Sequence, residues 1–141
     1  IVASLVGSEM CIRDRLTGDH IMDGSTVVIA PPDGNMTEYI DSLRLLENYD
    51  IDHFAPGHGN FMQEPDKTIQ SIIRHRLSRE SKVLRCVEKQ KNSNLDELLL
   101  LVYDDVPDIL HPIAKMSLLA HLIKLEDEGK LNKSKNNYSL S

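Results

Sequence analysis

The sequence has no tryptophan, few aromatic residues and only two cysteines, Cys11 and Cys86, in 141 residues. A disulfide-rich secreted fold is therefore excluded, and we expect the protein to reside in the reducing cytoplasm. No run approaches the roughly 20 consecutive apolar residues of a membrane-spanning helix, so we expect no membrane partner. An excess of positive charge is also missing. The net charge of −6 argues against a strongly basic nucleic-acid surface over the whole chain.

The first fifteen residues do not resemble the start of a natural protein. Their apolar stretch is short and interrupted, and no basic residue precedes it, so they do not fit a signal peptide. One frame of a common transposase-type library adaptor encodes residues 5–14, so residues 5–15 look like translated adaptor. The charged run at 13–15 would be costly in a buried strand. We assign residues 1–15 to an adaptor-derived artefact and expect native sequence from Leu16; the alternative is an exposed edge strand.

Two turns carry side chains that bind metals. The first is Thr-Gly-Asp-His at residues 17–20, and the second is Ala-Pro-Gly-His-Gly at residues 55–59. Imidazole and carboxylate are the ligands that zinc prefers together with thiolate, and one carboxylate has two oxygens with which to join two ions. Glycines beside Asp19 and His58 permit tight turns and close backbone approach. The two turns therefore predict a metal site that contains Asp19 and His58.

The order and spacing of these turns resemble the C-terminal half of a metallo-β-lactamase-fold hydrolase. The resemblance implies part of a four-layer αββα fold, of class α/β, and a parent enzyme that uses two zinc ions. It implies that Asp19 bridges the ions and orients a metal-bound hydroxide, which makes Asp19 catalytic as well as a ligand. It implies that His58 binds the second ion. The hydroxide would attack an ester, a thioester or a phosphodiester.

The sequence departs from this family in one respect. Such enzymes carry a His-x-His-x-Asp-His run upstream that supplies most of the metal ligands, and residues 1–141 contain no such run. We therefore expect a polypeptide of residues 1–141 alone to bind zinc weakly and to lack hydrolase activity. Two other histidines lie nearby. His20 follows the bridging aspartate, and the sequence does not tell where its ring points, whereas His53 is expected as a packed or solvated strand residue.

Residues 16–72 are expected to form the C-terminal part of the catalytic domain. The β-branched segment 26–29 predicts a strand. Thr37 is expected to cap a helix that ends near residues 48 and 49, and residues 51–55 are expected to form the strand that leads to His58. Loops at strand ends commonly hold ligands because the strands fix them rigidly.

A long helix is expected from about residue 66 to residue 90, and its residues 73–91 form the predicted link between two domains. The run His75-Arg76-x-x-Arg79-Glu80 resembles the linking helix of one branch of the superfamily. We name His75, Arg76 and Arg79 as candidate substrate-binding residues, with an arginine holding a substrate phosphate or tying the domains together. The alternative is a solvated helix face stabilised by nearby acids.

Residues 92–141 are expected to form a winged-helix domain. Helical patterns near 95–103 and 109–128 are followed by a short predicted β-wing from residue 130. This arrangement is similar to the winged-helix domain that follows some metallo-β-lactamase-fold hydrolases. We expect no specific DNA binding, because acidic residues accompany the cations of the last helix. Two alternatives to a hydrolase of small molecules stay open: an endoribonuclease that cuts single-stranded RNA, and a non-enzymatic nucleic-acid-binding module. The sequence does not identify the substrate or the oligomeric state.

Overall fold

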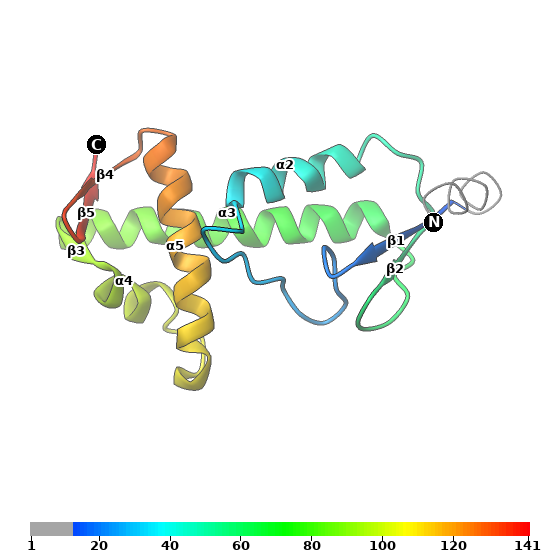
Figure 1. The fold of residues 1–141 in the computed structure, drawn as a ribbon, viewed down its shortest axis with the longest axis horizontal. Helices are drawn as coiled ribbons and strands as arrows, with labels where there is room; N and C mark the ends of the chain where they lie inside the picture. Colours follow the sequence, from blue (N-terminus) through cyan, green and yellow to red (C-terminus); the bar gives the residue numbers. More distant parts are fainter. Residues whose placement is uncertain (1–12) are drawn as a thin grey trace. The chain divides into compact units, whose positions relative to one another are not determined.

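The computed structural model describes residues 13–141, and Figure 1 shows the order of their elements. The expected artefact at residues 1–15 thus lies mostly outside the described residues. Among residues 13–141, no helix combines the length and the apolar character that crossing a bilayer requires. The elements, in chain order, are β1 (Asp14–Gly18), α2 (Met36–Leu46), β2 (His53–Pro56), α3 (Pro65–Gln90), β3 (Ser93–Asn94), α4 (Leu95–Val102), η1 (Asp108–Leu110), α5 (His111–Asp127), β4 (Leu131–Ser134) and β5 (Asn137–Leu140).

The chain divides into two compact units. The first contains residues up to Val27 together with Ser42–Ile73, and the second contains Val28–Asp41 together with Arg74–Ser141. Helix α3 therefore contributes its first nine residues to one unit and the remainder to the other. This division by contacts does not mark the ends of natural domains. The domain bounds at 16–72, 73–91 and 92–141 stay predictions.

The first unit is built on two parallel strands. Strand β1 pairs with β2, Asp14 opposite His53 and Leu16 opposite Ala55, with an irregularity between Leu16 and Gly18. The charged start of β1 is paired and only partly buried: Arg13 forms ion pairs with Asp50 and Asp52. Asp14 Oδ1 lies 2.7 Å from Nδ1 of His53. These charges therefore avoid the cost of burial without a partner.

Two expected elements of this region need correction. Residues 25–30 form no strand and belong to neither sheet of the described residues. Val28 in that segment is 43% exposed. Helix α2 begins one residue earlier than Thr37, because Asn35 caps it: Oδ1 of Asn35 accepts a hydrogen bond from the amide of Glu38 at 3.1 Å.

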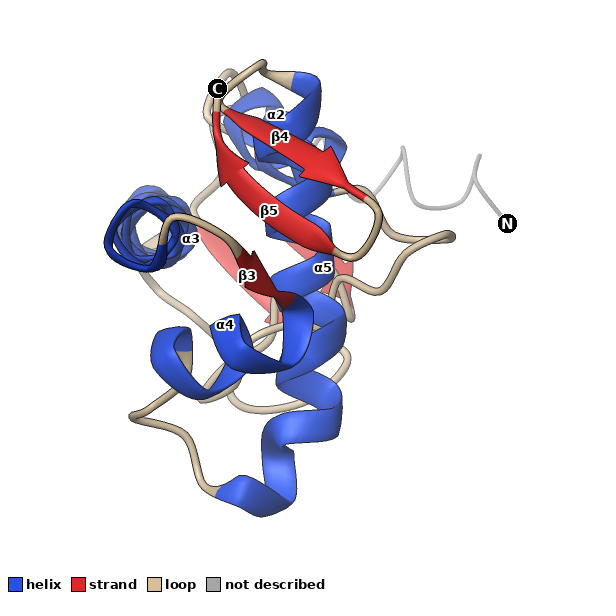
Figure 2. Cartoon of the chain, turned by 90° about the vertical axis from the view of Figure 1, so that its left-hand side faces the viewer, coloured by secondary structure: helices blue, strands red, loops and turns tan. Residues whose placement is uncertain are grey.

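The second unit has the helix and strand order that the sequence predicts for a winged helix. Strands β3, β5 and β4 form an antiparallel sheet in that order, which Figure 2 shows beside α4 and α5. Asn94 caps α4 by accepting bonds from two amides, while Glu97 bonds back to the amide of Asn94. Gly129, with φ of +69°, ends α5 and turns the chain into the wing.

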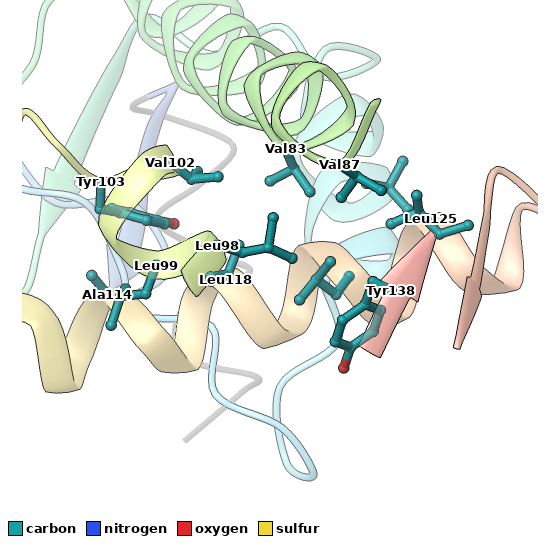
Figure 3. Close-up of a cluster of buried hydrophobic side chains, with 12 residues drawn as sticks. Val83, Val87, Leu98, Leu99, Val102, Tyr103, Ala114, Leu118, Leu125 and Tyr138 are labelled. Atoms are coloured by element: carbon teal, nitrogen blue, oxygen red, sulfur yellow. The ribbon is translucent and has the colours of Figure 1, made fainter. Parts of the chain in front are cut away.

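Apolar side chains from α3, α4, α5 and the wing form one buried cluster in this unit, shown in Figure 3. Leu98, Leu118, Leu122 and Leu125 are fully buried there. On α5, Leu118 is completely buried in this cluster, whereas Ile113 and Met116 are 46% and 48% exposed.

Polar groups are also buried in the second unit. Nζ of Lys124 on α5 lies 2.9 Å from Oε2 of Glu80 on α3, and both side chains are less than 10% exposed. His121 is completely buried, and neither ring nitrogen has a hydrogen-bond partner among the described residues. Burial, followed by the charges of Arg76 and Lys124, lowers the pKa of His121 to about 3. The folded unit therefore keeps this imidazole neutral.

The neutral His121 predicts an acid-dependent loss of stability. An unfolded histidine has a pKa of about 6.5, so between that pH and about pH 3 the unfolded chain binds a proton that the folded chain does not. The free energy of unfolding therefore falls as pH decreases through this window, by up to about 1.4 kcal/mol per pH unit from this residue. We expect the His121→Gln variant to show a correspondingly shallower slope between pH 6 and pH 4 in urea unfolding.

The control is His58→Gln, which removes an exposed histidine from the first unit. Each variant is compared with the parent chain by the slope and not by absolute stability, so any packing cost of the substitution cancels. An unchanged slope in His121→Gln would contradict the assignment of the acid sensitivity to this buried ring.

Candidate metal centre

The two predicted metal turns lie side by side because their strands are paired. Strand β1 ends at Gly18 and strand β2 ends at Pro56, and in a parallel pair both carboxyl ends lie at the same edge. The amide of Gly57 donates a hydrogen bond of 2.7 Å to the carbonyl oxygen of Gly18. The residues that follow these ends, Asp19 and His58, therefore leave the sheet at neighbouring points.

Gly57 is required by this close approach. A Cβ atom at this position would lie 3.0 Å from Oδ1 of Asp19 and 3.2 Å from the carbonyl carbon of Gly18. The second contact is with backbone, which cannot move aside without breaking the strand pairing. A side chain at residue 57 would thus push the two turns apart.

Asp19 and His58 face each other across the turns. Oδ1 of Asp19 lies 3.4 Å from Nε2 of His58, and the two side chains are 73% and 76% exposed. This separation is longer than an ordinary N–H···O hydrogen bond. Two ligands bound to one tetrahedral zinc by bonds of about 2.1 Å are roughly 3.4 Å apart. The donor types and their spacing therefore fit a shared metal ion.

The described residues supply only this part of a metal site. Within residues 13–141, no cluster of three or more histidine, cysteine, aspartate or glutamate side chains is arranged to hold an ion. His20 does not form a group of three with the pair; its Nε2 lies 3.0 Å from Oγ of Ser42, and burial lowers its pKa. His53 lies against Asp14 and against the ring of Phe61, 4.9 Å away.

The three candidate substrate-binding residues lie on the part of α3 that belongs to the second unit. Arg79 donates to both carboxylate oxygens of Asp105 at 2.7 and 3.0 Å and to the carbonyl of Val102 at 2.6 Å. This bidentate contact lowers the pKa of Asp105 to about 2. The guanidinium of Arg79 also lies 4.5 Å from the ring centre of Tyr103. The guanidinium of Arg79 therefore already contacts Asp105, Val102 and Tyr103.

Arg76 and His75 differ in burial. Arg76 is 4% exposed and lies 5.4 Å from the ring centre of Tyr39, so it is not part of a solvated helix face. His75 is exposed, and partial desolvation with the charges of Arg76 and Arg79 lowers its pKa. A phosphate-binding role for His75, Arg76 and Arg79 stays a prediction.

Sequence reasoning did not single out Asp23 and Asn60, which connect the two metal turns a second time. Oδ2 of Asp23 accepts hydrogen bonds from the amide of Asn60 at 3.1 Å and from its Nδ2 at 2.9 Å. These bonds lower the pKa of Asp23. The only signal in the sequence is that each residue adjoins a glycine in a turn.

Comparisons with known proteins agree with this arrangement. Residues 95–137 match the family model described as the beta-lactamase associated winged helix domain. A Drosophila melanogaster protein named Beta-lactamase-like protein 2 homolog is 36% identical over 121 residues, covering 84% of this chain and 40% of the relative. The Caenorhabditis elegans protein of the same name is 23% identical, covering 83% of this chain and 38% of the relative.

Two solved structures share the fold. A metallo-beta-lactamase family protein of Thermus thermophilus aligns with a TM-score of 0.78 and 17% identity, over 92% of this chain and 42% of that one. A beta-lactamase domain protein of Burkholderia ambifaria aligns with a TM-score of 0.80 and 20% identity, over 91% and 41%. The chain spans about two fifths of the length of these relatives. It therefore corresponds to the C-terminal part of a metallo-β-lactamase-fold protein and carries the associated winged-helix domain.

Proposed function

We propose that this chain is the C-terminal part of a hydrolase that uses two zinc ions. The observation that carries the proposal is the 3.4 Å separation of Asp19 Oδ1 and His58 Nε2 at the ends of two paired strands. A metal centre needs ligands that are held before the ion arrives, and paired strand ends hold these two. The similarity to metallo-β-lactamase-fold proteins supports the same role.

Each residue has a chemical part in this proposal. Asp19 offers two carboxylate oxygens with which it would hold the two ions and orient the attacking nucleophile. His58 would hold one ion through a ring nitrogen. When bound, zinc lowers the pKa of a water ligand and polarises the bond to be cleaved. The proposed substrates are esters, thioesters and phosphodiesters.

Residues 1–141 alone do not complete the proposed centre. A catalytic zinc ion generally has three protein ligands, whereas residues 13–141 would contribute two, one of them shared between ions. We therefore propose that the isolated chain is inactive and binds zinc weakly. We propose that the missing ligands come from a His-x-His-x-Asp-His run upstream of the part that corresponds to residue 16.

The proposal predicts that purified residues 1–141 retain far less than one zinc ion per chain after dialysis. Mass-spectrometric metal analysis gives the ratio, and the Asp19→Ala and His58→Ala variants show how much of any residual zinc depends on the pair. Near-stoichiometric zinc in the dialysed parent chain would contradict the incomplete site.

Another prediction concerns restoration of activity. Residues 16–141 are fused behind the upstream part of the Drosophila melanogaster relative, and we expect two zinc ions per chain and hydrolysis of an ester, a thioester or single-stranded RNA. Asp19→Ala should lower kcat/KM by more than about 100-fold, because even residues that only support zinc ligands contribute 10- to 100-fold. Asp33→Ala, a change of an exposed aspartate, is the matched control. A zinc-loaded fusion whose activity survives Asp19→Ala would reject the proposed role of Asp19.

A second candidate function is nucleic-acid binding by the winged-helix domain, and the wing favours it. Lys133 and Lys135 are exposed on the wing, and Lys133 lies 5.6 Å from the ring centre of Tyr138. Helix α5 is less suited to a nucleic-acid groove, because Ile113 and Met116 are exposed on it and Lys115 pairs with Asp96. Of the proposed substrates, single-stranded RNA has a phosphate backbone that Lys133 and Lys135 would contact. Specific reading of DNA is not proposed.

A further inference from the structure

We propose that Asp23 is a positioning residue for the metal centre: its carboxylate holds the turn that carries His58 at a fixed distance from Asp19. This inference rests on the function proposed above. Asp23 itself is not proposed as a ligand, because its Oδ2 accepts two hydrogen bonds from Asn60.

Two cross-links connect the turn at 17–23 with the turn at 55–60. The first is the 2.7 Å bond from the amide of Gly57 to the carbonyl of Gly18. The second is the pair of bonds from Asn60 to Asp23. Along one turn, Asp19 lies between the two cross-linked positions, and along the other turn His58 lies between them. In each turn, the candidate metal ligand is therefore flanked in sequence by two positions that are hydrogen-bonded to the other turn.

Packing at Gly59 shows that the second cross-link is a close contact of the two turns. Gly59 has φ of +94°, which a residue with a side chain rarely adopts. A Cβ atom there would lie 2.6 Å from Cβ of Asp23 and 2.9 Å from its carbonyl oxygen. The turns are thus in direct contact at Asp23, and any side chain at residue 59 would separate them.

The other end of the first turn is also fixed. The amide of His20 donates to the carbonyl of Thr17 at 3.0 Å, and Oγ1 of Thr17 donates to the carbonyl of Ile21 at 2.9 Å. The side chain of Ile21 is fully buried, so it anchors the turn to the unit just before Asp23. The segment that carries Asp23 is therefore fixed by the buried Ile21. Through its bonds to Asn60, Asp23 can restrain the more exposed turn at 57–60.

Such a restraint matters most for ligands that are exposed. Asp19 and His58 are more than 70% exposed, so surrounding side chains do little to limit their movement. Phe54 and Met62 close the base of the turn at 57–60 through two backbone hydrogen bonds, but without the second cross-link the bond of Gly57 to Gly18 would have to hold this turn against the first one. Zinc would then have to order this turn when it binds. Loss of outer contacts that orient metal ligands typically costs 10- to 100-fold in metal affinity.

The test is a zinc titration of the chain 1–141, followed by NMR signals of the His58 ring. We expect Asp23→Ala to raise the dissociation constant for zinc by about 10-fold or more. Asp23→Asn keeps an oxygen acceptor for the amide of Asn60, so it should restore most of the affinity. Asp33→Ala removes an aspartate from an exposed loop and should match the parent chain.

Thermal unfolding separates positioning from general stability. We expect the melting temperature of Asp23→Ala to stay within about 2 °C of the parent, as for most surface substitutions. Equal zinc affinity in Asp23→Ala and the parent would overturn the proposal. So would a loss of affinity accompanied by a large fall in melting temperature, because Asp23 would then serve the stability of the fold.

A separate readout distinguishes failure of this inference from failure of the proposed function. If zinc shifts the His58 signals equally in the parent and in Asp19→Ala, the metal pair itself is rejected. Hydrogen exchange of the His58 and Asn60 amides, measured without metal, then still tests the restraint. We expect exchange to be faster in Asp23→Ala than in Asp33→Ala, and equal rates would overturn the role of Asp23 regardless of zinc.

Discussion

The close approach of the Gly18 and Gly57 backbones is the constraint on which the candidate metal centre depends. Their hydrogen bond of 2.7 Å brings together residues that lie far apart in the sequence. It is possible only because β1 and β2 run parallel and end at the same edge, and because residue 57 has no side chain. The position of Asp19 opposite His58, and the contact of Asp23 with Asn60, both follow from this approach.

Among the described residues, the second unit differs from the first in that charged side chains are buried beside its apolar core. Glu80 and Lys124 form a buried ion pair, and Glu128 and Lys130 extend it into a network in which each buried charge has a second partner. The two arginines of α3 that were predicted as substrate-binding residues have different surroundings. Arg76 is buried, while Arg79 holds the segment after α4 through Asp105.

Much of this architecture could be predicted because its signals are local. The caps at Asn94 and Gly129 mark the ends of helices directly, and the apolar spacing of α3 predicts its length. The two glycine turns also predict that Asp19 and His58 lie together, and the structure places their side-chain atoms 3.4 Å apart, while metal binding by the pair stays a prediction. The predicted strand at 26–29 was wrong because strand formation also depends on non-local sheet pairing: its β-branched residues favour extension, but the segment belongs to neither sheet of the described residues. Asp23 was missed because its partner, Asn60, is distant in sequence and no periodicity connects the two.

The register of β1 against β2 has a consequence for folding kinetics. Asp14 and His53 are 39 positions apart, whereas the wing strands β4 and β5 are joined by a tight turn. Forming the long-range pair requires closure of a large loop before any strand bonds compensate for the lost chain entropy. A hairpin such as the wing forms within about 1–10 μs. Asp19 and His58 thus come together only after the slow, long-range pairing of β1 with β2. In the unfolded chain, the two residues are far apart and cannot bind one zinc ion as a preformed pair.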